Sequence, residues 1–432
     1  MFMLDKIFKI SANKTDVKTE VIAGISTFLT MAYIVVVNPG ILSETGMDFG
    51  AVFVATCLAA AYGSLVMGIV ANYPVALAPG MGLNAFFTYS VVMGMNQPWQ
   101  VALGCVFWSG TIFLLLSIFR IREWIINSIP AALKTGIAAG IGLFLAIIAL
   151  QKAGVVVADS STLVKMGDMT SLPVILFFSG FILISALHQR RIPGAVIIGI
   201  LAVTAVGGCF GLVNYHGIVA MPPDIRPTLL QLDIRGALEP GLLAVIFAFL
   251  FVDFFDTSGT LIAVAHKGGL LDSEGKLPRL GRALLADSSA SIAGSLLGTS
   301  TTTSYIESGA GIAAGGRTGL TALTVAVLFL ATLFFSPFVL MIPAFAASSA
   351  LLFVAVFMLS SIKYLDWDDA TEYTPAILTA CIMPFTYSIS DGIAVGFISY
   401  LLIKIIAGRY KQVSVSVYII AILSFLKFAA LP

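Results

Sequence analysis

Three acidic residues are predicted to lie well inside long apolar segments of the chain: Asp253, Asp256 and Glu307. A charged side chain at the centre of such a segment costs about 3 kcal/mol of membrane-insertion free energy, so residues of this kind are functional candidates by default. A carboxyl group away from water is neutral more readily than one in solution, and it can then donate a hydrogen bond or release a proton. We interpret the three residues as candidates for ligand binding and proton coupling.

Two of these carboxylates belong to one polar stripe. Asp253 and Asp256 are three residues apart. Thr257 lies four positions after Asp253, and Thr260 lies four positions after Asp256, so all four residues lie on one side of a helix. The stripe interrupts a helix made otherwise of Leu, Ile, Val and Phe. For Asp253 an alternative stays open, in which it ties two helices together without touching a ligand.

Two segments are too short and too rich in Gly, Pro or Thr for ordinary spans. In residues 73–87, Pro79 removes a donor and two glycines weaken the helix, so we expect an extended stretch to about Leu83 and a half-helix from near Asn84. Residues 298–309 predict an extended stretch and a half-helix from near Glu307. Unpaired backbone at membrane depth is tolerated only where protein buries it or it lines a wet cavity, and half-helix N-termini would offer N–H groups to a small ligand. The alternative is a pair of ordinary Gly-rich packing helices.

The side chains around these breaks suit a flat heterocycle. Asn84, Asp256 and Glu307 offer donors and acceptors for its polar edge. Aromatic rings that could stack on its faces come from Tyr305, Phe255, Phe86 and Phe87.

The amino-acid composition indicates the class of protein that positions these residues. Of the 432 residues, 59% are hydrophobic and 10% are charged, and the mean hydropathy is +1.03. Soluble proteins carry about 25% charged residues, so a cytosolic enzyme, a nucleic-acid binder and a disordered chain are excluded. The net charge of +1 predicts no nucleic-acid partner. The four cysteines are scattered, and we expect neither a metal ion nor a cofactor. The sequence indicates an all-α polytopic membrane protein in the lipid bilayer.

The apolar pattern predicts fourteen transmembrane segments. They fall at 20–37, 51–71, 75–92, 101–119, 129–150, 171–187, 192–213, 241–265, 283–298, 300–315, 319–341, 343–361, 374–390 and 391–408. With both termini cytoplasmic, most basic loops fall inside, as the positive-inside rule requires; the exception is the acidic loop 363–372. Residues 1–19 form a cytoplasmic segment without the features of a cleaved signal peptide. In the C-terminal segment 409–432, residues 413–428 favour an interfacial helix.

The chain also resembles two copies of a seven-span unit. Ile-Pro-Ala begins both the fifth and the twelfth span, and Gly-Ser-Leu occurs in both the second and the ninth, each time just before a broken segment. An odd number of spans per copy inverts the second copy in the membrane. We therefore predict inverted repeats at 20–213 and 241–408, joined by an extracytoplasmic loop at 214–240. Such repeats with matching interruptions are typical of secondary transporters with a site at the midplane.

Several longer motifs resemble one known family. They are AGISTFLTMAY at 23–33, APGMGLNAFF at 78–87, FDTSGTL at 255–261, GTSTTTSYIESGAG at 298–311 and GGRTGLTA at 315–322. Their pattern resembles the azaguanine-resistance (AzgA-like) purine permeases, a branch of the nucleobase–ascorbate transporter superfamily, from about residue 15 to residue 410. The resemblance implies a core domain at 20–119 and 241–341, a gate domain at 129–213 and 343–408, and a homodimer.

The resemblance also implies roles for individual residues. Glu307 would be the principal base-binding carboxylate, Asp256 its partner and proton-coupling residue, and Asn84 the contact from the third segment. The other predicted ligand contacts are Ala85, Tyr305, Ile306, Ser308, Phe255 and Thr260, the last at the position where relatives outside this branch carry a histidine.

We therefore expect a proton-driven symporter in the cytoplasmic membrane that imports purine bases, with hypoxanthine and guanine ahead of adenine. A transporter of the same fold for uracil, xanthine or an anion is the first alternative. A passive channel is the second. An intramembrane aspartyl protease is the third, although Asp253 and Asp256 share one helix, whereas that enzyme needs two helices. The protein is expected not to be an enzyme.

Overall fold

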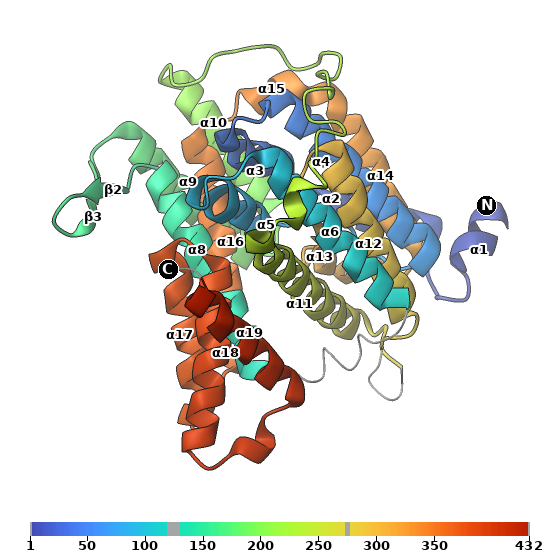
Figure 1. Ribbon diagram of the computed structural model, residues 1–432. Helices are drawn as coiled ribbons and strands as arrows, with labels where there is room; N and C mark the ends of the chain where they lie inside the picture. Colours follow the sequence, from blue (N-terminus) through green and yellow to red (C-terminus); the bar gives the residue numbers. More distant parts are fainter. Residues whose placement is uncertain (1, 119–129, 273–276, 431–432) are drawn as a thin grey trace.

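The computed structural model describes residues 2–118, 130–272 and 277–430 (Figure 1). Within these ranges, nine helical stretches are long and apolar enough to cross a membrane. Further apolar helices are shorter, and four short strands complete the regular structure. The predicted class, an all-α multi-pass membrane protein, is confirmed at this level.

A first helix group combines elements from both halves of the chain. Its members are α2 (Val17–Met31), α3 (Ile34–Leu42), α4 (Phe49–Val66), α5 (Met81–Ala85), α6 (Trp99–Ile118), α11 (Leu243–Gly268), α12 (Leu280–Leu297), α13 (Ser308–Ala313) and α14 (Gly319–Thr332). Helix α14 packs against α2 and α4, and α12 packs against α4 and α6. Helices far apart in the sequence therefore share one packed unit (Figure 1).

A second helix group is built in the same way. It contains α8 (Ala131–Lys152), α9 (Leu172–Gln189), α10 (Ala195–Cys209), α16 (Ala344–Leu359), α17 (Ala370–Thr386) and α18 (Ile389–Ile406). Helices α16 and α17 pack against α8, and α16 also packs against α9 and α10. Figure 1 shows these helices side by side, with the red C-terminal ones next to α8.

The remaining elements are short or peripheral. They are α1 (Phe2–Phe8), α15 (Ser336–Leu340), α19 (Val415–Ala430), the π-helical η2 (Met67–Ala71) and η3 (Phe86–Gly94), the 3-10 turns η1 (Ser43–Thr45), η4 (Gly236–Leu238), η5 (Pro240–Leu242), η6 (Leu333–Phe335), η7 (Ser360–Tyr364) and η8 (Tyr410–Gln412), and the hairpin of β2 (Val156–Asp159) and β3 (Leu163–Met166). The loop sequence did not predict this hairpin. The tail does form a helix, α19, and its interfacial position stays a prediction.

The two broken segments meet as a pair of antiparallel strands inside the first helix group. Strand β1 (Leu77–Pro79) pairs with β4 (Thr302–Ser304), with Ala78 opposite Thr303. Backbone bonds extend the pair at both ends, from the Gly80 N–H to the Thr301 carbonyl at 2.9 Å and from the Tyr305 N–H to the Ala76 carbonyl at 3.0 Å. Pairing satisfies backbone groups that a lone extended segment would leave without partners at this depth. Because the strands are antiparallel, the half-helices that follow them leave the pair at opposite ends.

The expected extended stretches are confirmed, but one half-helix begins earlier than predicted. Helix α5 starts at Met81 rather than near Asn84, because the Asn84 N–H bonds to the Gly80 carbonyl at 2.8 Å and closes the first turn over both glycines. Helix α13 starts at Ser308, next to Glu307 as expected. The first predicted span, 20–37, is divided between α2 and α3 around Tyr33.

Both repeated motifs occupy matching places. Pro130 and Pro343 are the N-cap residues of α8 and α16. A Cβ added at Gly63 would lie 2.9 Å from Leu77 Cβ in β1, and one at Gly294 would lie 2.7 Å from Thr302 Oγ1 in β4. Each glycine therefore lets its helix approach the strand that follows it in the chain.

Candidate functional site

Glu307 lies between β4 and α13, and two other elements hold it there. Tyr33 lies at the break between α2 and α3, and its hydroxyl donates to Glu307 Oε1 at 2.6 Å. The Thr30 hydroxyl donates to the Glu307 backbone carbonyl at 3.4 Å. A hydroxyl bond to a carboxylate is among the stronger hydrogen bonds in proteins, so the carboxylate has a defined orientation. The sequence showed Tyr33 only as the end of a motif and gave no sign of this contact.

Asp256 faces the same region from α11. The charges of Asp256 and Glu307 are close enough to interact, and α11 packs against α13. The structure thus brings together the two carboxylates that were predicted as partners. Two carboxyl groups in a largely apolar surrounding repel each other when both are charged, so such a pair suits a bound proton or a ligand N–H.

Asn84 contributes a side chain whose polar atoms are unused. It lies in α5 and is fully buried. Across the described residues, neither its Oδ1 nor its Nδ2 atom has a hydrogen-bond partner. A buried amide without partners costs about 1–3 kcal/mol of folding free energy per polar group, which is consistent with a ligand that completes its bonds. Ala85 beside it and Thr260 in α11 are buried as well.

Two of the other predicted contacts hold the strand pair. The Tyr305 hydroxyl donates to the Pro79 carbonyl at 2.6 Å, and the Ser308 hydroxyl accepts the Ala76 N–H at 3.0 Å. Both therefore position β1 against β4 and fix the start of α13. The Ile306 side chain is 39% exposed.

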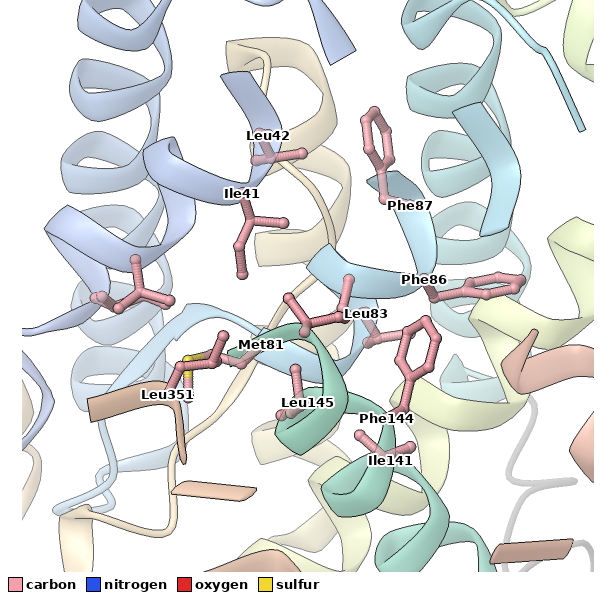
Figure 2. Close-up of a cluster of buried hydrophobic side chains, with 14 of the residues drawn as sticks. Ile41, Leu42, Met81, Leu83, Phe86, Phe87, Ile141, Phe144, Leu145 and Leu351 are labelled. Carbon is pink, nitrogen blue, oxygen red and sulfur yellow. The ribbon is translucent and has the colours of Figure 1, made fainter. Parts of the chain in front are cut away.

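The predicted stacking rings are placed only in part. Phe86 packs edge-to-face against Phe249, with ring centroids 4.9 Å apart. Phe87 is fully buried in the hydrophobic core (Figure 2). The side chain of Phe255 lies outside the described part of the structure. Among these rings, Phe86 and Phe87 serve the packing of the first helix group.

Asp253 makes the helix-to-helix contact that was the alternative to a ligand role. It is fully buried, and its Oδ2 atom accepts a hydrogen bond from the Ser291 hydroxyl of α12 at 3.1 Å. Thr257, one turn further along α11, also contacts α12. Half of the polar stripe therefore serves packing, and a role of Asp253 in proton coupling stays a prediction.

A fourth carboxylate, Asp287 of α12, links the elements of the site. It is fully buried. It accepts from the Thr257 hydroxyl at 2.8 Å and from the Ser304 hydroxyl at 2.9 Å, and Thr257 and Thr303 share a hydrogen bond of 2.8 Å. Asp287 thus links α11 to β4. It binds α11 at Thr257, the residue after Asp256, and β4 at Ser304, three positions before Glu307.

Two acidic residues besides the predicted three are also fully buried in the described structure, Asp287 and Glu20. Asp287 was missed because it stands in the polar run Ala-Asp-Ser-Ser-Ala-Ser, and that run was itself the signal of a buried hydrogen-bond network. Glu20 is buried too, and caps α14 by accepting the Arg317 N–H at 2.8 Å and the Thr318 N–H at 3.2 Å. The sequence did not reveal these two buried acids, because the hydrogen bonds that offset the cost of burying their charges come mostly from donors distant in sequence.

Two acids of the loop that departs from the positive-inside rule are paired with basic residues from later in the chain. Lys404 of α18 is 1% exposed and lies 2.6 Å from Glu372, while Arg409 pairs with Asp369. Hydrogen bonds from Thr371, together with the charges of Arg409 and Lys404, lower the pKa of Asp369. The loop 363–372 therefore shares one ion-pair cluster with the last turn of α18 and the residues just after it.

Comparison with known proteins places this architecture among transporters. Residues 18–395 match the model of a family described as "Permease family". The chain is 51% identical over 425 residues to the adenine permease AdeP of Escherichia coli (strain K12), covering 98% of the chain and 96% of that protein. It is 43% identical over 429 residues to the guanine/hypoxanthine permease PbuO of Bacillus subtilis (strain 168), covering 98% and 99%.

A solved structure with the same fold is the transmembrane domain of a cyanobacterium bicarbonate transporter, BicA. The TM-score is 0.66 at 14% identity, and the match covers 88% of the chain and 97% of that domain. At this identity the likeness concerns the fold alone.

Proposed function

Because the chain belongs to the permease family, we propose that it transports purine nucleobases across the membrane. The observation that carries the proposal is the identity of 51% and 43% to an adenine and a guanine/hypoxanthine permease, each over nearly the whole chain. The higher of the two values makes adenine the first substrate to test, where the sequence motifs had favoured hypoxanthine and guanine.

The proposed site lies where the strand pair meets α11 and the two half-helices. A purine presents N–H donors and ring-nitrogen acceptors along its edge. Glu307 would accept from an N–H of the base, and the two free polar atoms of Asn84 would complete a donor–acceptor pair. Because Tyr33 and the strand pair already fix Glu307, little ordering is needed when the ligand binds.

We further propose proton symport through Asp256 and Glu307. Support comes from the packing of α11, which carries Asp256, against α13, which follows Glu307, and from the repulsion of their two charges, which one proton on the pair relieves. A transporter that binds the proton and the base at adjacent groups couples their movement, since each favours the same charge state of the site.

For the architecture we propose fourteen spans as two inverted seven-span repeats, with both termini cytoplasmic. The matching proline caps of α8 and α16 and the matching glycines behind β1 and β4 support the repeat. The first helix group would be the core domain at 20–119 and 241–341, and the second the gate domain at 129–213 and 343–408. The homodimer expected from the family resemblance stays a prediction.

A competition assay tests the function. Vesicles that contain the purified protein should take up radiolabelled adenine, and unlabelled adenine, guanine or hypoxanthine should reduce that uptake, whereas uracil and bicarbonate should not. Uptake of adenine no faster than in empty vesicles, or competition by uracil alone, would contradict the proposal.

A further inference from the structure

An ion pair joins the two helix groups at the end where α3 and α8 finish. The Lys152 ammonium, in the last turn of α8, lies 2.5 Å from Glu44 Oε1 in η1. The same ammonium donates to the Gly40 carbonyl of α3 at 3.0 Å. Lys152 belongs to the second helix group and Gly40 to the first, and η1 with Glu44 directly follows α3 of the first group. The contacts therefore cross the seam between the groups.

A second polar contact crosses the seam at the same end, where the backbone carbonyl of Tyr387, the residue after α17, accepts the Ser90 hydroxyl of η3 at 2.7 Å. Within the second group, the Tyr387 hydroxyl donates to Gln151 Oε1 of α8 at 2.8 Å and so anchors this carbonyl to the end of α8. Gln151 adjoins Lys152, so the two sets of contacts are continuous along the end of α8. We name Glu44, Lys152, Gln151, Tyr387 and Ser90 the seam latch.

An apolar layer lies next to the seam latch. Figure 2 shows Ile41, Met81 and Leu83 of the first group beside Ile141, Phe144, Leu145 and Leu351 of the second. Rings continue the layer towards the latch, with the Phe144 centroid 6.5 Å from that of Tyr89 and 5.7 Å from that of Tyr387. The half-helix α5, which carries Asn84, contributes Met81 and Leu83 to this layer. The layer thus packs α5 against the second helix group next to the latch.

A cavity of about 160 Å³ opens between α3 and α16 beside the ion pair. Lys152, Ile41, Leu351 and Ser348 line it. The Ser348 hydroxyl is buried and has no hydrogen-bond partner among the described residues. A packed interior holds few spaces of this size, so the seam is incompletely packed on the latch side of the apolar layer.

We propose that the seam latch is a reversible gate that closes this end of the transport route and must open in every cycle. The inference rests on the proposed function. The latch suits that role because its ion pair is only partly buried, with side-chain exposures of 21% for Lys152 and 34% for Glu44, and exposed pairs are weak enough to break without a large barrier. Ligand binding at Glu307 would have to shift the balance between the closed and open arrangements.

The test measures how fast a cysteine in the cavity reacts. Ser348→Cys is placed in a chain whose four native cysteines are replaced by alanine, and the purified protein is treated with a polar thiol reagent. Glu44→Gln and Lys152→Met should each raise the labelling rate by up to about fivefold, the population shift that loss of one exposed pair allows. The charge-reversed double variant Glu44→Lys with Lys152→Glu should restore the slow rate, which a misfolded protein would not do.

The matched control is Lys165→Met, which breaks an ion pair with Asp159 at 3.0 Å inside the β2–β3 hairpin, away from the seam. Unchanged labelling in both single latch variants, or equal acceleration by Lys165→Met, would overturn the gate. Adenine binding is measured on the same preparations. A parent protein that binds no purine but keeps the labelling pattern would refute the proposed function and leave the latch standing.

Discussion

At the scale of single residues, the site depends on carboxylates that are held by hydroxyl groups. Tyr33 orients Glu307, and Asp287 gathers the hydroxyls of Thr257 and Ser304. Thr257 lies in α11 beside Asp256, and Ser304 ends β4, the strand that leads to Glu307. The positions of Asp256 and Glu307 relative to each other therefore depend on a residue that neither binds the base nor was foreseen as part of the site.

Asp287→Asn should weaken adenine binding. Two hydroxyls donate to the two oxygens of the carboxylate. Asparagine has one acceptor oxygen and one NH₂ donor group in their place, so it cannot accept a bond at both positions. Loss of one hydrogen bond to a charged group is worth about 1.5–3 kcal/mol, so we expect the dissociation constant to rise about tenfold or more. Isothermal titration of the purified variant measures it. The exposed Asp366→Asn serves as the control, and an unchanged dissociation constant for Asp287→Asn would reduce the residue to a packing role.

Residue type and setting were enough to predict part of the site. Glu307 and Asp256 were recognisable because a carboxylate in an apolar segment needs a reason to be there, and Asn84 because it follows a broken stretch. Tyr33 and Asp287 were not recognisable as site residues, because their importance lies in the partner that each one meets across the fold. A hydroxyl 274 positions away from its acceptor leaves no local pattern.

At the scale of elements, the strand pair is the feature from which the site is built. Strands β1 and β4 each leave backbone groups that only the other can satisfy. The composition of both segments predicted extended stretches and half-helices, but not that they pair or in which register. The start of α5 at Met81 was also missed, since a helix turn over Gly80 and Gly82 depends on the close contact that these glycines allow.

Gly82→Ala should slow transport without removing the site. A Cβ at Gly82 would lie 2.5 Å from Ile141 Cγ2 of α8, so α5 and α8 could not close to their present distance. Overpacking of this kind costs about 1–3 kcal/mol, and we expect the initial rate of adenine uptake in vesicles to fall by about tenfold. Gly281→Ala in α12 is the matched control, because a Cβ there meets nothing within 4 Å. Equal rates for the two variants would show that this contact does not limit transport.

At the scale of the whole molecule, two helix groups face each other across a seam. The apolar pattern predicted most helices to within a few residues, because membrane spans are long and strongly hydrophobic. It could not show that Glu372 and Asp369 of the loop 363–372 pair with Lys404 and Arg409, since those cations lie more than thirty positions later in the chain. Seven-span symmetry and orientation remain proposals that rest on matched motifs.

Asp256→Asn should separate purine transport from the proton gradient. An asparagine amide does not take up or release a proton near neutral pH. Adenine should therefore still equilibrate across the membrane but no longer accumulate. Vesicles with an imposed pH gradient measure this as the ratio of internal to external radiolabelled adenine, with and without a protonophore. Accumulation by the variant that a protonophore still abolishes would remove Asp256 from the coupling role.

The most direct measurement is adenine binding to purified Glu307→Gln, with Glu239→Gln, an exposed loop residue, as the control. We expect the Glu307 variant to stay folded and to lose affinity by about a hundredfold, because a charged acceptor is replaced by a neutral amide, while the Glu239 variant should bind like the parent. Parent-like affinity in Glu307→Gln would contradict the site from which the proposed function is built.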